Sequence, residues 1–291
     1  MGRVPLPHRL VSLALLLPFL SAILLSSKDA FLKPVSEQVG PFATLWALSV
    51  LAAILCWPIV LFGGDGWPSL QFWILLPVLS AVGLLCHTLF LEGLRRTDFS
   101  LIGPLWGIAP VVAAISGMLV LDEHMGPMFW GGIGLVVIGV FGLGWRSTYS
   151  LRHGTEGSVG FFLALAGVVI AGAAASFDKI AIEASSPILW MAAVSTVWAV
   201  VLYPRGMSSV RTSRLPVKYI IWASVLGAAG AVVHNYALLL LPVAVAVGLK
   251  QSAGLFAVAI GKIGFGDSHT VERMIWALML GLGVLLMLLG A

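Results

Sequence analysis

Apolar runs follow one another along the whole chain, and short polar segments separate them. A membrane-spanning helix needs about 20 consecutive, mostly apolar residues. Runs of this kind are predicted at residues 10–32, 41–62, 69–91, 99–121, 126–145, 159–182, 187–204, 217–240, 242–265 and 271–290. Backbone groups in lipid must be satisfied within the segment, so each run is expected to be helical. The pattern predicts an all-α polytopic membrane protein with ten transmembrane helices.

Polar residues in and beside these runs recur in the same order in the two halves of the chain. They form three matched pairs: Asp29 with Asp178, His87 with His234, and Glu123 with Asp267. Because five is odd, two copies of five helices enter the membrane in opposite directions, which makes an inverted repeat of the kind common in secondary transporters. We predict a first five-helix repeat at residues 1–145, a connecting loop at 146–158 and a second repeat at 159–291.

The composition agrees with this picture. Hydrophobic residues make up 60% of the chain and charged residues 10%, against about 25% charged in soluble domains. The net charge of +4 comes from basic residues scattered over the loops, which favours anionic lipid headgroups over nucleic acid as their partner. Several of the 33 glycines lie in the fifth run and predict close helix contact there: Gly131, Gly132, Gly134, Gly139 and Gly142.

Lys250 lies about nine residues into a very apolar run, near the expected bilayer midplane. Intramembrane lysines usually face a carboxylate or a water-filled cavity. One alternative is therefore a static salt bridge to Asp29 or Asp178. The other is a cavity lysine that contacts an anionic group of a solute or titrates during transport. When the repeats are aligned, Trp106 takes the place of Lys250, so an aromatic ring is expected across the cavity from the ammonium.

The remaining polar residues also leave alternatives open. Asp29 and Asp178 lie beside Lys28 and Lys179 near the ends of their runs, so they are either solvated and paired there or couple transport to protons. Glu123 and Asp267 fall in tight turns before the fifth and tenth runs. We expect these two carboxylates to cap helix N-termini.

His87 and His234 occupy equivalent places in the two halves. Each is either a structural residue or part of the transport pathway, since imidazole titrates near neutral pH. Asn235 and Tyr236 would add hydrogen bonds to such a pathway. The two cysteines, Cys56 and Cys86, lack the spacing of a metal site. No metal or other cofactor is expected.

Residues 93–143 contain a proline in the fourth run, an acidic residue thirteen positions later and a glycine-rich fifth run, carried by Pro110, Glu123 and Gly139–Val140. This pattern resembles the EamA repeat of the drug/metabolite transporter superfamily. The second half matches more loosely, with Gly254 in place of the proline and Asp267 in place of the glutamate. The resemblance implies a transporter, not an enzyme, with ten helices around a central cavity lined by the first, third, fourth, sixth, eighth and ninth.

We therefore predict a secondary transporter, an exporter or exchanger, that moves small polar or amphipathic metabolites by alternating access. The P-loop pattern of ATPases is absent, and a proton is a possible coupling ion. Other readings are a non-transporting scaffold or accessory subunit, and a haem protein with His87 and His234 as axial ligands. A bacterial inner membrane and a monomer or homodimer are expected. Basic loop residues place both termini outside the cytoplasm, whereas the resemblance places them inside.

Overall fold

The computed structural model describes residues 8–36, 41–63, 66–96, 103–148, 155–212, 217–253, 256 and 270–290. Its regular elements are α1 (His8–Ser36), α2 (Pro41–Gly63), α3 (Leu70–Arg96), the 3₁₀ helix η1 (Gly103–Ile108), α5 (Ala109–Leu121), α6 (Pro127–Thr148), α7 (Thr155–Glu183), α8 (Pro187–Thr212), α9 (Val217–Leu240), α10 (Val243–Lys250) and α12 (Thr270–Leu289). These elements are all helices, so the predicted all-α class is confirmed for the described residues.

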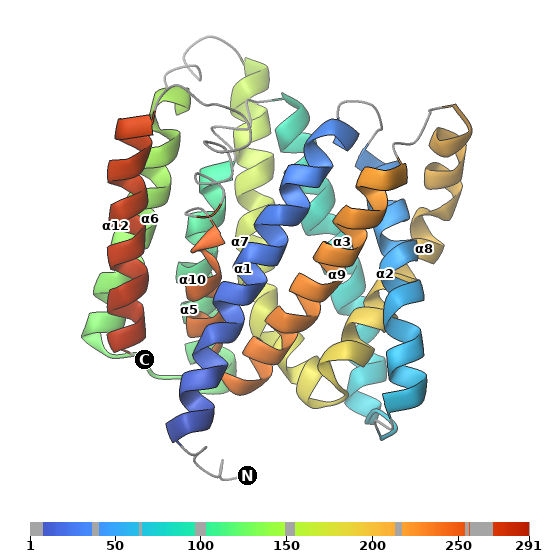
Figure 1. The fold of residues 1–291 in the computed structure, drawn as a ribbon, viewed down its shortest axis with the longest axis horizontal. Coiled ribbons are helices and arrows are strands. Elements are labelled where there is room, and N and C mark those ends of the chain that lie inside the picture. Colours follow the sequence, from blue (N-terminus) through green and yellow to red (C-terminus); the bar gives the residue numbers. More distant parts are fainter. Residues whose placement is uncertain are drawn as a thin grey trace.

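The helices form an upright bundle (Figure 1). Among the described residues, five segments are long and apolar enough to cross a membrane: Phe42–Gly63, Leu70–Phe90, Val159–Glu183, Pro187–Ser208 and Val217–Leu240. Leu105–Leu121 and Pro127–Gly139 are shorter apolar helices. Many large hydrophobic side chains on these helices are exposed, as expected for a surface that contacts acyl chains.

Some helices extend beyond the apolar runs that predicted them. α1 and α7 each contain 29 residues, or roughly 43 Å at 1.5 Å per residue. This length exceeds the hydrocarbon core of a bilayer, about 30 Å, and reaches into the headgroup region. In the same way, α6 continues to Thr148 and α7 begins at Thr155. Both helices therefore extend into the predicted connecting loop at 146–158.

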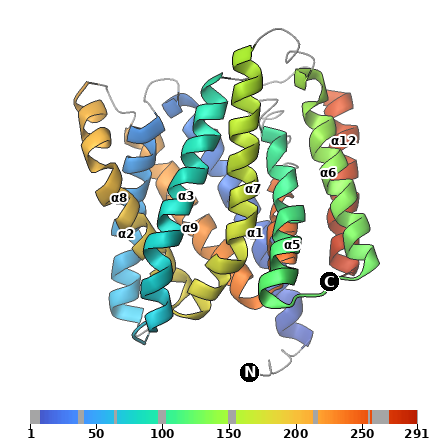
Figure 2. The ribbon, with the colours of Figure 1, turned by 180° about the vertical axis from the view of Figure 1, so that it is seen from behind.

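The closest helix pairs each join one helix from residues 8–148 to one from residues 155–290. α1 packs along α9, α2 along α8, α3 along α7 and α6 along α12, while α5 lies against α7 and α10. The pairs α3 with α7 and α6 with α12 are seen side by side in Figure 2. The two halves of the chain therefore interlock and do not form separate units.

Glycine allows the closest of these contacts. A Cβ on Gly132 of α6 would lie 2.7 Å from the Gly283 carbonyl oxygen of α12, and a Cβ on Gly283 would lie 2.7 Å from the Val136 nitrogen. Gly131 and Gly134, which the sequence also assigned to a close contact, have open space beside them. Only one face of α6 meets α12, so glycines one or two positions from Gly132 point away from that contact.

The ninth predicted run, residues 242–265, is not one continuous α-helix. α10 ends at Lys250, Gln251 and Ser252 form a turn, and Ala253 is helical again. The Gln251 and Ser252 amides donate to carbonyl oxygens three residues back, at 3.0 and 3.1 Å. The Ser26 hydroxyl of α1 donates to the Ala253 carbonyl at 3.0 Å. Side-chain donors of this kind satisfy backbone groups that a helix break exposes.

Candidate functional site

Lys250 is the last residue of α10, which runs through the interior of the protein. Residues 243–249 of this helix are all buried, and Lys250 itself is partly buried. Its Nζ atom lies 3.2 Å from Nε2 of His234 on α9. The carbonyl groups at a helix C-terminus carry partial negative charge and favour a cation. The end of α10 therefore provides one stabilising interaction for the ammonium, and the imidazole provides a second.

Residues on three further helices lie near enough for charge–charge interactions within one group that includes this pair. The charges of Asp178 on α7 and Lys28 on α1 act on the Lys250 ammonium, and the charges of Lys28 and Lys250 act on His87 of α3. We call Lys28, His87, Asp178, His234 and Lys250 the inner polar cluster. It draws one residue from each of five helices, α1, α3, α7, α9 and α10.

Both imidazoles have one nitrogen engaged by the protein. In His87, Nδ1 lies 2.9 Å from the Gly83 carbonyl oxygen and the ring stands edge-on to Trp198, with centroids 4.9 Å apart. In His234, Nε2 faces the Lys250 ammonium, which can only donate, so Nδ1 must carry the hydrogen. That Nδ1 is buried and has no hydrogen-bond partner among the described residues. His234 therefore has an unused donor on the side of its ring that faces away from Lys250.

The predicted static salt bridge to Lys250 is not formed among the described residues. Asp29 pairs instead with Lys28 at 2.9 Å and is 62% exposed. Asp178 interacts with Lys250 through space, without an ion-pair contact in the described part of the chain. In the sequence, Lys28 was considered only as a neighbour of Asp29. In the structure, Lys28 is the member of this pair that belongs to the inner polar cluster.

The other predicted cavity residues have different surroundings. The Asn235 amide is buried, and its Nδ2 donates to the Pro187 carbonyl at 3.1 Å, which ties α9 to the start of α8. Tyr236 is exposed. Trp106, on η1, is partly buried, and its ring lies 5.1 Å from that of Phe90 on α3. Its position opposite Lys250 stays a prediction.

Asn235→Ala should destabilise the protein without changing the affinity for solute. The substitution removes a buried hydrogen bond to the Pro187 carbonyl, which costs about 0.5–1.5 kcal/mol, and a lower Tm in detergent would measure the loss. Tyr236→Phe, at the next position, is the control and should leave Tm unchanged. Weaker solute binding by Asn235→Ala at an unchanged Tm would place Asn235 in the pathway after all.

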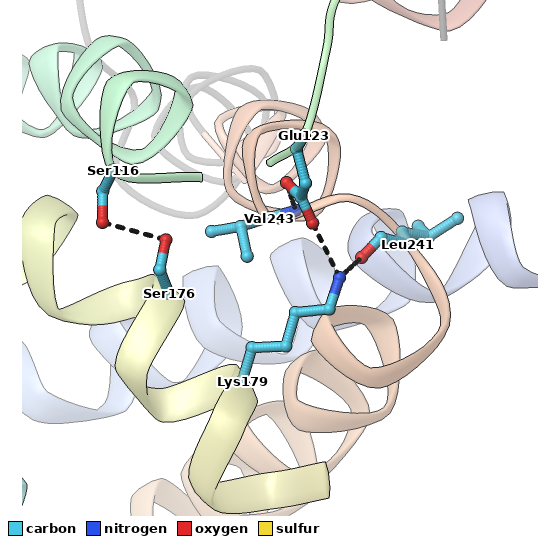
Figure 3. Close-up of polar contacts among 6 residues, drawn as sticks. All are labelled: Ser116, Glu123, Ser176, Lys179, Leu241 and Val243. Atoms are coloured by element: carbon cyan, nitrogen blue, oxygen red, sulfur yellow. Dashed lines mark hydrogen bonds and ion pairs between the residues drawn. The ribbon is translucent and has the colours of Figure 1, made fainter. Parts of the chain in front are cut away.

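A second polar site lies at one end of the bundle, where an ion pair is almost completely buried (Figure 3). Lys179 of α7 is 0% exposed and Glu123, between α5 and α6, is 8% exposed. The Lys179 Nζ lies 2.9 Å from Glu123 Oε1 and donates to the Leu241 carbonyl at 2.6 Å. The other carboxylate oxygen, Oε2, accepts from the Val243 amide at 2.7 Å. We call this ion pair and its two backbone contacts the Glu123–Lys179 clamp.

The end of α5 is shaped to present this carboxylate. Asp122 adopts a left-handed conformation with φ of 55°, and the next amide, of Glu123, donates to the Gly117 carbonyl at 3.1 Å. A Cβ on Gly117 would lie 2.8 Å from Glu123 Oε2, so glycine leaves room for the carboxylate. Nearby, the Ser116 and Ser176 hydroxyls are 2.9 Å apart and join α5 to α7.

From the sequence, we predicted that the Glu123 carboxylate caps the N-terminus of the helix that follows it, which is α6. The structure places the carboxylate at the N-terminus of α10 instead, at the first helical residue, Val243. Left-handed Asp122 ends α5, and the Glu123 side chain that follows is buried against Lys179 and Val243 and does not lie along α6. Asp267, its predicted counterpart, lies outside the described residues. The sequence missed the role of Lys179 as the partner of Glu123.

The chain is similar to known proteins in sequence and in fold. Residues 12–145 match the model of the EamA-like transporter family. The resemblance inferred from Pro110, Glu123 and the glycine-rich helix is thereby confirmed for residues 12–145, and the protein is a multi-pass integral membrane protein. Members of the EamA-like family are transporters, for which a small-molecule solute and surrounding lipid are the expected partners.

The fold of the whole chain is similar to that of a solved protein. The match, titled "Crystal structure of protein", has a TM-score of 0.75 and covers 96% of this chain and 98% of the other. Sequence identity is 16%, so the likeness concerns the fold alone. No curated protein matches the sequence.

Proposed function

We propose that the protein is a secondary transporter, an exporter or exchanger, that moves small polar or amphipathic metabolites by alternating access. The helix pairing supports the inverted repeat on which this mechanism depends. In the repeat, α1 corresponds to α7, α2 to α8, α3 to α9 and α6 to α12. Replacing each helix by its counterpart turns the pair α1–α9 into the pair α7–α3, which also packs closely. The same exchange returns α2–α8 and α6–α12 to themselves.

Interruptions at equivalent points of the two halves give further support. In the first half, η1 gives way to α5 between Ile108 and Ala109. In the second half, the turn after Lys250 falls at the equivalent place. Transporters with inverted repeats often bind solutes at interrupted helices near the middle of the membrane, where free backbone groups and side chains meet. In this protein Trp106 and Lys250 stand just before the two interruptions.

The inner polar cluster is the proposed solute site, and the observation that carries the proposal is the contact between Lys250 and His234. Both Lys250 Nζ and His234 Nδ1 have hydrogens to donate, and the imidazole Nδ1 has no acceptor among the described residues. A solute carboxylate would accept from the Lys250 Nζ. An apolar or ring portion would face Trp106, so an amino acid or organic acid fits best. Asp178 and His87 are then candidates to carry a coupling proton.

Lys250→Met tests this assignment because it keeps the length of the side chain and removes its charge. We expect uptake into proteoliposomes to fall at least tenfold while Tm stays within a few degrees of wild type, since no ion pair is broken. Radiolabelled amino acids and organic acids chosen by a thermal-shift screen would serve as solutes. Lys218→Met, which neutralises an exposed lysine on α9, is the matched control and should transport normally.

Two results would count against the assignment. Normal uptake by Lys250→Met would remove Lys250 from the solute site. A poorly folded Lys250→Met protein that recovers when Asp178 is also neutralised would make the lysine structural. A bacterial inner membrane, proton coupling and a monomeric or dimeric state remain parts of the proposal.

A further inference from the structure

We propose that the Glu123–Lys179 clamp is a one-sided latch: it closes one end of the solute pathway and positions α10, the helix that carries Lys250. The proposal rests on the transport function proposed above. Glu123 and Lys179 are then positioning residues, which act on the solute through α10 and do not touch it.

The clamp fastens three separate parts of the chain at the same end of the bundle. The end of α5, the last turns of α7 and the link between α9 and α10 meet there, at the end where α12 also finishes (Figure 1). Glu123 comes from the first half of the chain, whereas Lys179, Leu241 and Val243 come from the second half. Alternating access requires the halves to shift against each other, so this end cannot open while the clamp is intact.

α10 connects the clamp to the inner polar cluster. Its first residue, Val243, donates to the Glu123 carboxylate, and its last, Lys250, contacts His234. The helix is about 11 Å long from end to end and is buried along its length. A Cβ on Gly248 would collide with the Met287 side chain of α12, so α10 packs closely against α12 there. Its eight residues form one hydrogen-bonded helix, which moves as a unit. A solute that draws Lys250 towards itself would therefore pull Val243 away from Glu123.

The electrostatics of α10 fit this role. A carboxylate lies at its N-terminus and an ammonium at its C-terminus, the arrangement that the helix dipole favours. Both charges hold the helix in its present place. Loss of either contact, at Val243 or at Lys250, removes one of the two electrostatic restraints on α10. A change at the solute site can therefore weaken the hold on the helix that the clamp positions.

The repeat supplies no second copy of this lysine. Asp178 and Asp29 are counterparts, and the next residue is Lys179 in one half but Ala30 in the other. The two ends of the bundle therefore differ in this respect, and the structure represents a state closed at the clamp end, where Leu241 and Val243 are also buried. The latch gives the transport cycle a preferred resting state.

The experiment measures access to this end by cysteine labelling. The reporter is Ser176→Cys, one turn from Lys179 and fully buried, in a protein whose Cys56 and Cys86 are replaced by serine. The test variant is Glu123→Gln/Lys179→Met, which removes the ion pair without leaving a charge buried alone. We expect a charged, membrane-impermeant thiol reagent to label the introduced reporter thiol at least tenfold faster in the test variant.

The matched control removes an exposed ion pair of similar length, Glu92–Arg96 at 2.8 Å on α3. Glu92→Gln/Arg96→Gln should leave the labelling rate unchanged. An unchanged rate in a folded test variant would overturn the latch, and so would an equal increase in the control. The readout needs no solute, so it is independent of the uptake by Lys250→Met: faster labelling with normal uptake by Lys250→Met would keep the latch and reject the proposed solute site.

Discussion

Lys179→Met should lower the free energy of unfolding by about 3–5 kcal/mol, the usual cost of removing one partner of a buried ion pair. The Glu123 carboxylate would keep the Val243 amide but lose its counter-charge, and the Leu241 carbonyl would lose a hydrogen bond of 2.6 Å. Water cannot replace these contacts easily, because both side chains are almost completely buried. Reversible unfolding in mixed detergent micelles would measure the change.

Two comparisons make the origin of this loss clear. Glu123→Gln/Lys179→Met should recover most of the stability, because no charge then remains buried without a partner. Lys28→Met breaks a pair of the same 2.9 Å length in which Asp29 is largely exposed, and should cost about 0–1 kcal/mol. Equal losses from Lys179→Met and Lys28→Met would show that burial does not govern the strength of the clamp.

Helix positions followed from the sequence because bilayer thickness fixes the length of an apolar run. The predicted run at 217–240 coincides with α9, and 41–62 differs from α2 by one residue. The turn after Lys250 could not be predicted in the same way. The apolar pattern continues across it, and the donor that satisfies a carbonyl beside the turn is distant in the sequence: the Ser26 hydroxyl bonds to the Ala253 carbonyl.

The sequence singled out four of the five residues of the inner polar cluster, whose role stays a prediction, whereas it did not indicate the clamp. Comparing the halves of a repeat finds residues that recur, such as His87 and His234. Lys179 has alanine as its counterpart, so this comparison passes over it. Adjacent helical residues also point about 100° apart, which is why Asp178 interacts with Lys250 while Lys179 turns to Glu123. Only the packing of α5 beside α7 and α10 reveals that pair.

Gly132→Ala should destabilise the contact between α6 and α12, although alanine is the better helix former. The added methyl group would lie 2.7 Å from both the Gly283 carbonyl oxygen and the Met287 nitrogen. Backbone atoms cannot rotate aside as a side chain can, so the two helices would have to separate. Overpacking of this kind costs about 1–3 kcal/mol, and close packing is the main force that holds membrane helices together.

Gly134→Ala, two residues further along α6, is the matched control. Among the described residues, no atom outside the adjoining part of α6 lies within 4 Å of a Cβ at Gly134, so the higher helix propensity of alanine should raise stability by up to about 1 kcal/mol. Gly283→Ala adds a methyl group from the α12 side of the same contact. Combined with Gly132→Ala, it should cost less than the sum of the two single changes, because one separation of the helices relieves both clashes. Equal changes in unfolding free energy for Gly132→Ala and Gly134→Ala would contradict this prediction. They would show that the close approach of the α6 and α12 backbones does not limit side-chain size at residue 132.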